Sequence, residues 1–366
     1  MLAIREIARR RLQFGLVTGV VTLIAYLVLM VTGLGLGLNQ AAGTALLGLD
    51  GDYLAYSDRS NLSVIRSQLS EAQVADIAAA PGVTAAAPIG YQAAAIEFRP
   101  GEVDTAALIG LDLGSIAEPE VIEGRALTPE DTRGLLVDRT WVSLTGTAIG
   151  DTLLVPVGLA VEPFQVVGIV DEGSFFFQPA MYLHRDTWRQ ISYFAVEDET
   201  PYASIVLLQG DNLEGATGTG WEVVTKDTAF WNIEGVSAQQ GTVNALRYMG
   251  LLIGAMVIGV FFYVITLQKV ALLGVLKAIG ASGVYLTVQG MLQVAVVTLT
   301  GALVAAGLAV LTKATVLSSD AIPIAFTTSA IISSLVAVVI AGVLGAALSM
   351  RQIGRIDPII AMQQQQ

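Results

Sequence analysis

The chain has 366 residues, of which 54% are hydrophobic and only 14% are charged, and its mean hydropathy is +0.67. This composition excludes an ordinary soluble protein, so membrane spans are sought first. The absence of cysteine excludes disulfides and thiolate metal sites. The net charge of −12 argues against nucleic acid as a partner, because its phosphates would be repelled.

The first segment, residues 1–13, alternates apolar side chains with arginines, which favours a cytoplasmic amphipathic helix on the inner leaflet or a simple basic flank. Four apolar stretches follow, each about as long as the roughly 20 residues that a helix needs to cross a bilayer. They are residues 14–38, 247–267, 285–311 and 328–349, and none contains an acidic residue. Shorter polar segments connect or follow them at residues 268–284, 312–327 and 350–366.

The basic residues predict the orientation of these spans. Arginines precede the first span, lysines lie in the 268–284 connection, and arginines follow the fourth span. Positive flanks stay in the cytoplasm. We therefore expect a multi-pass protein of the cell membrane with both termini cytoplasmic. Residues 39–246 then face outward, with 28 acidic against 9 basic residues, a balance typical of a solvated surface.

The 39–246 segment is long enough for a folded domain of its own. Strand-like runs begin around residues 46–56, and residues 70–80 read as a helix with Ser70 and Gln73 as a capping-box pair and Pro81 beyond its end. Further strand patterns occupy residues 83–98, 106–111, 134–137, 152–157, 164–170, 180–183 and 204–208. Short helices are expected at residues 140–144 and 185–191. The sequence thus predicts four transmembrane α-helices with a large α+β extracytoplasmic domain between helices 1 and 2.

Catalytic chemistry is sparse in this sequence. No G-x-x-x-x-G-K-[ST] phosphate loop occurs, so any ATP must be bound by a separate subunit. The single histidine, His184, excludes histidine-cluster metal sites, and a residue at a strand end is the favoured interpretation. The spans hold almost no ionisable groups, which argues against an ion-coupled transporter. We expect a non-catalytic protein with no covalently bound cofactor.

Glycines recur at four-residue spacing within the spans. Such G-x-x-x-G pairs let membrane helices approach closely, although they also arise by chance in glycine-rich sequences. The pairs are Gly15/Gly19, Gly33/Gly37 and Gly250/Gly254.

Two cytoplasmic motifs carry a family resemblance. LQKVALLGVLKAIGAS, residues 267–282, resembles the turn after the second span of MacB/FtsX-type permeases of ABC transporters, and RIDPIIAM, residues 355–362, resembles their tail. Weaker landmarks in the outer segment are IEGRALTPED, AIGDTLLV and FQVVGIV. The resemblance covers essentially the whole chain. Two departures stand out: Lys269 replaces the family's arginine, and Leu272 replaces its acidic residue.

The resemblance implies a homodimer joined to two copies of a separate ABC ATPase, which binds ATP and Mg²⁺. ATPase motion would pass through a cytoplasmic coupling helix, residues 268–284, and drive expulsion of a cargo taken from the membrane lipid. The residues it assigns to ATPase coupling are Leu273, Gly274, Leu276, Lys277, Ala278, Ile279, Gly280, Arg355, Asp357 and Pro358.

Within that family the layout is most similar to haem-efflux permeases of Gram-positive bacteria, so haem is the preferred cargo. Side chains that suit a flat, amphipathic iron porphyrin lie near the outer surface. The candidate residues are Tyr248, Met249, Glu234, Phe175, Phe176 and Phe177. An interfacial role for Tyr248 and a core role for the phenylalanines are the competing interpretations. The alternatives are an exporter of lipid, peptide or antibiotic, and a non-transporting regulator of cell-wall hydrolases similar to FtsX.

Overall fold

The computed structural model describes residues 10–193, 196–197, 199–315 and 323–354. The predicted 1–13 helix therefore lies mostly outside the described residues, as does part of the 312–327 connection and the tail beyond residue 354. The chain divides into two compact units. The helical unit comprises Met1–Gly37 and Gln240–Gln366, and the β-rich unit comprises Leu38–Gln239.

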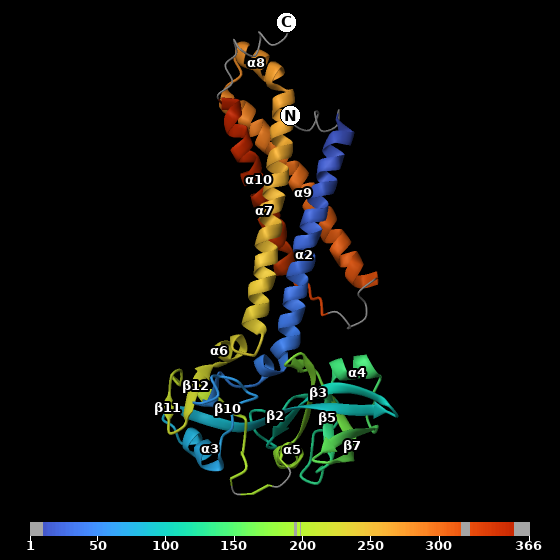
Figure 1. The fold of residues 1–366 in the computed structure, drawn as a ribbon, viewed down its shortest axis with the longest axis vertical. Coiled ribbons are helices and arrows are strands. Elements are labelled where there is room, and N and C mark those ends of the chain that lie inside the picture. Colours follow the sequence, from blue (N-terminus) through green and yellow to red (C-terminus); the bar gives the residue numbers. More distant parts are fainter. Residues whose placement is uncertain (1–9, 194–195, 198, 316–322, 355–366) are drawn as a thin grey trace. The chain divides into compact units, whose positions relative to one another are not determined.

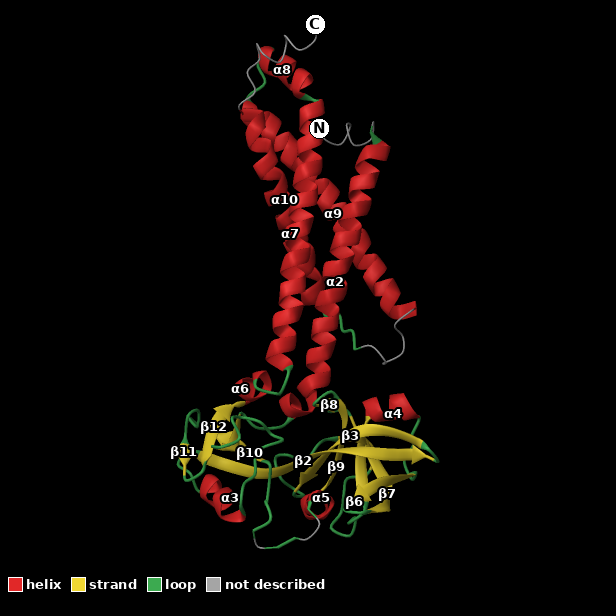
Figure 2. Cartoon of the chain, in the orientation of Figure 1, coloured by secondary structure: helices red, strands yellow, loops and turns green. Residues whose placement is uncertain are grey.

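The helical unit contains the long helices seen in Figure 1. They are α2 (Arg11–Gly48), α7 (Val236–Gln268), α9 (Gly283–Thr315) and α10 (Thr328–Gly354), with the short α8 (Val270–Ala278) between α7 and α9. Within the described residues, four helices are long and apolar enough to cross a membrane. With the β-rich unit inserted between the first and second, the predicted fold class is confirmed (Figure 2).

Small residues let these helices pack closely. A Cβ atom on Gly345 of α10 would overlap the backbone of Ala255 in α7, and one on Gly259 would lie 2.8 Å from the carbonyl oxygen of Gly345. The helix-packing role expected for glycine pairs holds for two of the three. A Cβ atom on Gly33 or Gly37 would contact the 323–326 segment, and one on Gly250 or Gly254 would contact a side chain of α2. A Cβ atom on Gly15 or Gly19 would have no neighbour within 4 Å.

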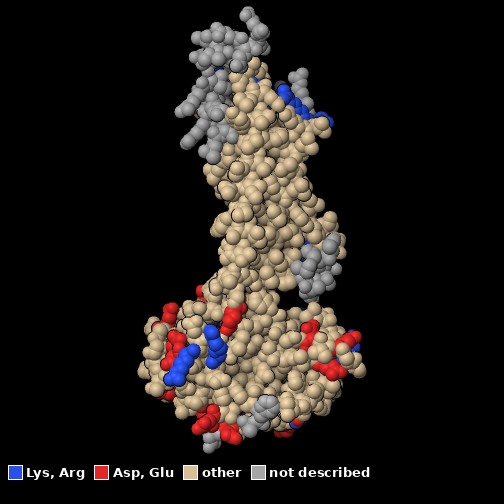
Figure 3. All heavy atoms as spheres, viewed as in Figure 1, with Lys and Arg blue, Asp and Glu red and all other residues tan. Residues whose placement is uncertain are grey.

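Hydroxyl side chains within the helices bond to their own backbone. Thr18, Thr22, Thr266 and Thr298 each donate to the carbonyl oxygen four residues earlier, at 2.7–2.9 Å. An unsatisfied polar group in hydrocarbon costs several kcal/mol, and these local bonds avoid that cost. The surface of the helices on the face shown in Figure 3 is correspondingly almost free of charge, whereas the β-rich unit carries many acidic and basic side chains.

The β-rich unit is built on one strongly bent, 12-stranded sheet. Its longest strand, β2 (Val83–Arg99), pairs with β10 (Ile205–Gly210) over its first half and with β3 (Glu102–Leu111) over its second half. The path of the sheet is β11-β12-β1-β10-β2-β3-β9-β5-β7-β4. The other strands are β1 (Tyr53–Ser57), β4 (Val121–Gly124), β5 (Gly134–Asp138), β6 (Thr152–Val157), β7 (Ala160–Val170), β8 (Ser174–Phe175), β9 (Gln178–His184), β11 (Thr217–Gly218) and β12 (Trp221–Thr225).

Short helices cover the sheet: α3 (Glu71–Ala78), α4 (Arg139–Thr145), α5 (Arg185–Ser192) and α6 (Lys226–Trp231). The predicted capping box of Ser70 and Gln73 is present at α3. The strand pattern expected from residue 46 was wrong at its start, because α2 continues to Gly48 past a kink at Gly43. The apolar side chains of Ala45 and Leu46 enter the core of the β-rich unit from that helix.

Replacing Gly345 by leucine tests the close α7–α10 contact. Overpacking of this kind costs about 1–3 kcal/mol, so we expect the melting temperature of the helical unit in detergent, followed by circular dichroism, to fall by several degrees. Gly307→Leu is the matched control, because no atom lies within 4 Å of a Cβ at Gly307. Equal effects of the two substitutions would contradict the packing described.

Candidate functional site

The turn after α8 has a backbone conformation that requires glycine at one position. Gly280 has φ = +104°, a left-handed backbone that favours glycine. Its N–H donates to the Lys277 carbonyl at 3.0 Å, and the Ala281 N–H donates to the Leu276 carbonyl at 2.9 Å. These two bonds form a Schellman motif, which satisfies carbonyl groups at the helix end.

The next helix begins at once. The Ser282 hydroxyl accepts from the Tyr285 N–H at 3.2 Å and so caps α9. The sequence A-I-G-A-S, residues 278–282, therefore encodes the end of one helix, a left-handed turn and the start of another. At the other end of α8, the Lys269 ammonium lies 5.9 Å from the centroid of the Phe14 ring.

The two sides of α8 differ in exposure. Leu273, Gly274 and Leu276 face the helical unit, where both leucines pack against its apolar core. The opposite side presents Leu272, Val275 and Ile279, with exposed fractions of 58%, 47% and 76%. These three residues, at i, i+3 and i+7, form one apolar stripe that we call the α8 face.

The structure thus sorts the residues predicted to couple to an ATPase. Ala278, Ile279 and Gly280 lie on the exposed side. Leu272 and Val275 are exposed as well, although the sequence analysis did not assign them to coupling, because nearly every position of the segment is apolar and its periodicity does not distinguish the two sides. The predicted tail residues Arg355, Asp357 and Pro358 lie outside the described residues.

In the β-rich unit, two of the residues predicted to bind cargo, Phe175 and Phe176, contact the ring of Tyr91. The Tyr91 ring centroid lies 5.1 Å from that of Phe175 and 4.9 Å from that of Phe176. Burial, together with the nearby Glu234 carboxylate, raises the pKa of Tyr91 to about 12. Glu234 itself is exposed and accepts a hydrogen bond from the Ser63 hydroxyl. Aromatic rings and a carboxylate therefore share one neighbourhood.

The aromatic run forms a tight hairpin tip between β8 and β9. Phe176 and Phe177 have φ of 50° and 63°, as the two central residues of a type I′ turn require. Left-handed backbone costs roughly 1–2 kcal/mol per non-glycine residue. The N–H groups of these residues donate to the carbonyl oxygens of Ala42 and Ala41 in α2, at 2.9 and 2.8 Å, which holds the turn in place.

The remaining cargo candidates belong to the helical unit. Tyr248 and Met249 are adjacent on α7 and are 66% and 60% exposed. Exposed apolar residues continue along the helix at Leu252, Ile253 and Met256. A largely apolar, exposed surface therefore runs along α7.

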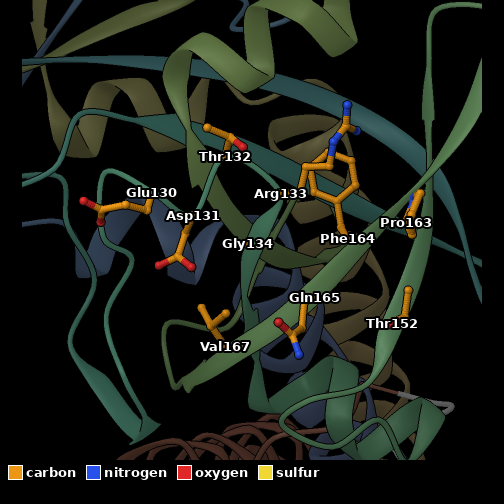
Figure 4. Close-up of a pocket in the computed structure, with 10 residues that line it drawn as sticks. All are labelled: Glu130, Asp131, Thr132, Arg133, Gly134, Thr152, Pro163, Phe164, Gln165 and Val167. Atoms are coloured by element: carbon orange, nitrogen blue, oxygen red, sulfur yellow. The ribbon is translucent and has the colours of Figure 1, made fainter.

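A pocket of about 440 Å³ in the β-rich unit carries charged side chains (Figure 4). Two of its charged residues are paired within the protein: Asp131 accepts from Arg125 at 2.8 Å and from the Thr128 N–H at 2.8 Å, and Arg133 pairs with Glu162. The hydrogen bonds from Arg125 hold the pKa of Asp131 well below its usual range. The IEGRALTPED landmark thus forms a structural clamp.

Metal chemistry has little support in the described part of the chain. Across it, no group of three or more histidine, cysteine or acidic side chains lies close enough to hold a metal ion. His184 ends β9, with Nε2 2.9 Å from the Thr128 carbonyl oxygen. The histidine therefore occupies the strand-end position favoured by the sequence.

Comparison with known protein families gives two adjacent matches. The MacB-like periplasmic core domain matches residues 14–229, more than half of the chain. The FtsX-like permease C-terminal domain matches residues 244–358. Together they include most of the β-rich unit, the α8 segment, α9, α10 and most of α2 and α7.

Individual proteins that resemble this chain share less than 30% of their residues with it. A protein of Staphylococcus haemolyticus named "Putative hemin transport system permease protein HrtB" is 24% identical over 99% of this chain and 98% of its own. Its namesake in Staphylococcus epidermidis is 29% identical over 54% of this chain and 55% of its own. The crystal structure of the periplasmic region of MacB from Actinobacillus actinomycetemcomitans aligns with a TM-score of 0.36 at 16% identity, over 52% of this chain and 96% of that one.

The clamp in the β-rich unit predicts a pH dependence. Because the pKa of Asp131 is lower in the folded than in the unfolded protein, its contribution to stability is complete above its unfolded pKa of about 3.9 and is lost as pH falls below that value. Asp131→Asn should therefore lower the melting temperature by a few degrees at pH 7, with a difference that shrinks toward pH 2.

Tryptophan fluorescence is the appropriate measurement, because all four tryptophans of the chain lie in the β-rich unit. Asp211→Asn, at an exposed aspartate in a turn, serves as the control and should change the melting temperature little at either pH. A deficit of Asp131→Asn that is as large at pH 2 as at pH 7 would contradict the assignment.

Proposed function

The chain belongs to the MacB/FtsX-type permeases of ABC transporters, and from that membership we propose that it is the permease subunit of a pump that extrudes a hydrophobic or amphipathic cargo, with haem preferred. The subunit is non-catalytic, and the family implies an ATPase partner. Two copies of the permease and two ATPase subunits, which bind ATP and Mg²⁺, form the proposed pump.

The orientation we propose places both termini and α8 in the cytoplasm and the β-rich unit outside. The positive charges of Lys269 and Lys277 at the two ends of α8, and of the arginines at and before the start of α2, support this arrangement. The acidic surface of the β-rich unit is consistent with the outer side of the membrane (Figure 3).

The α8 face is the observation that supports coupling to the ATPase most directly. Anchors at i, i+3 and i+7 are the pattern by which a helix enters a hydrophobic groove on a partner. Leu273 and Leu276 fix the opposite side of the helix to the core of the helical unit. Movement of a groove that holds Leu272, Val275 and Ile279 would therefore be transmitted to α7 and α9, which flank α8 in the chain.

Ile279→Asp tests this contact. Loss of a central interface anchor costs about 2 kcal/mol, or roughly 30-fold in affinity. Purified with its ATPase, the variant should lose most ATPase association and permease-dependent ATP hydrolysis. Leu159→Asp is the control, because Leu159 is also an apolar residue, 97% exposed, but lies in the β-rich unit. Normal ATPase association by Ile279→Asp would refute the proposed contact.

The choice of haem rests on one observation, the 24% identity along nearly the full length of a protein named for hemin transport. Side chains compatible with haem support it. Tyr248 and Met249 are exposed on α7 and supply an oxygen and a sulfur ligand, and Glu234 is exposed in the β-rich unit. Phe175 is buried, so its contribution would be to support the turn, while Phe177 remains available for contact.

Haem binding is testable by absorption spectroscopy. Haemin added to the purified permease–ATPase complex should give a shifted Soret band and stimulate ATP hydrolysis. Tyr248→Phe, Met249→Ala and Glu234→Ala should each weaken the shift, whereas Tyr285→Phe, at another exposed tyrosine of the helical unit, should not. An unchanged Soret band in the intact complex would remove haem from consideration and leave lipid, peptide or antibiotic export to be tested by the same ATPase assay.

A further inference from the structure

A second pocket of the β-rich unit lies where strand β2 changes partner. The pairing of β2 with β10 ends at Ile89, and its pairing with β3 begins at Gly90. Two sheet segments that diverge at one strand leave a crevice between them, a common position for ligand pockets. This pocket has a volume of about 240 Å³. It is lined by Ile65, Ser67, Gln68, Tyr91, Gln92, Ala93, Trp188, Ser192, Tyr193 and Ser204.

The indole ring of Trp188 packs against two glycines of the sheet. Helix α5, which carries Trp188, contacts β2 and β3 (Figure 1). Gly90 and Gly110 are directly paired on these two strands, and a Cβ on Gly90 would overlap the indole ring. The ring is 1% exposed and meets Tyr193 edge-on, with centroids 6.0 Å apart. Two glycines and an aromatic neighbour therefore fix the tryptophan at this pocket.

Some hydrogen-bonding groups of the residues that line the pocket have no partner among the described residues. Trp188 Nε1 and Ser192 Oγ are buried without a hydrogen-bond partner among the described residues. Buried indole N–H groups ordinarily have an acceptor. Ser204 Oγ accepts from the Tyr91 N–H at 3.1 Å and Ser67 Oγ accepts from the Ser57 N–H at 2.9 Å. Because each of these hydroxyls still carries its own hydrogen, each retains a donor.

The lining points to one class of ligand. Among the described residues, the lining contains no charged side chain, and the acidic β-rich unit repels anions. A purely apolar ligand would leave the amides of Gln68 and Gln92 and the buried Trp188 N–H unpaired, which is costly. A sugar ring instead carries hydroxyl groups that both donate and accept hydrogen bonds and so match the amides and hydroxyls of the lining. The volume is below the range of drug-sized sites and suits a single ring.

We propose that this pocket binds a neutral saccharide unit at the outer surface of the membrane. The site is independent of cargo export, because it depends only on the β-rich unit. Strand alternation places Gln92 on the same face of β2 as Gly90, the face that carries Trp188. Gln92 therefore supplies an amide beside the indole, and Gln68 supplies a second from the loop before α3.

Saturation-transfer NMR on the purified full chain tests the proposal. The protein is held in lipid nanodiscs free of sugar-based detergent, and the probes are N-acetylglucosamine and glucose. We expect transfer to the ring protons of at least one sugar. Gln92→Ala and Trp188→Phe should weaken binding about fivefold or more, as expected for the loss of a hydrogen bond. Trp231→Phe, at an exposed tryptophan of α6, should leave binding unchanged.

A second arm separates the sources of the sugar. Cosedimentation with purified peptidoglycan that is lost in Gln92→Ala would indicate a cell-wall glycan, whereas binding of the free sugars alone would indicate a soluble saccharide. The Gln92→Ala variant keeps the test valid if Trp188→Phe fails to fold. No transfer to either sugar, or binding that is unchanged in a folded Gln92→Ala protein, would overturn the proposal.

Discussion

The left-handed backbone at Gly280 is the constraint on which the conformation of α8 and the turn after it depends. A helix that ended without it would leave carbonyl groups of α8 unsatisfied close to the apolar core of the helical unit. With it, only four residues separate α8 from α9, and Ser282 already caps the second helix. The orientation of α8 is thereby fixed. Its inward leucines join the core, and Leu272, Val275 and Ile279 are left exposed.

The helices that receive this segment contain little besides apolar and small side chains. Many of their threonine hydroxyls donate to a carbonyl oxygen of the same helix, and α7 and α10 approach through glycines. Such helices offer few ionisable groups with which to couple transport to an ion gradient. Membership of the permease family implies an ATPase partner, and the sequence itself contains no phosphate loop.

Much of the fold was predictable because it follows from local chemistry. Hydropathy gave the four spans, and the capping box at Ser70 and Gln73 marked the start of α3. The extension of α2 to Gly48 was not predictable, because its last turns are held by tertiary contacts of Ala42 and Leu46. Which side of α8 is exposed could not be predicted either, because an almost uniformly apolar segment has no polar face to indicate it. The coupling and haem residues remain predictions.

The central claim is that the α8 face is where the ATPase binds. Hydrogen exchange of the backbone amides of residues 270–282, measured by mass spectrometry with and without the ATPase and ATP, tests it most directly. The account predicts that exchange in this segment slows by roughly tenfold or more in the complex. Unchanged exchange there, together with protection of another segment on the same side of the membrane, would contradict it.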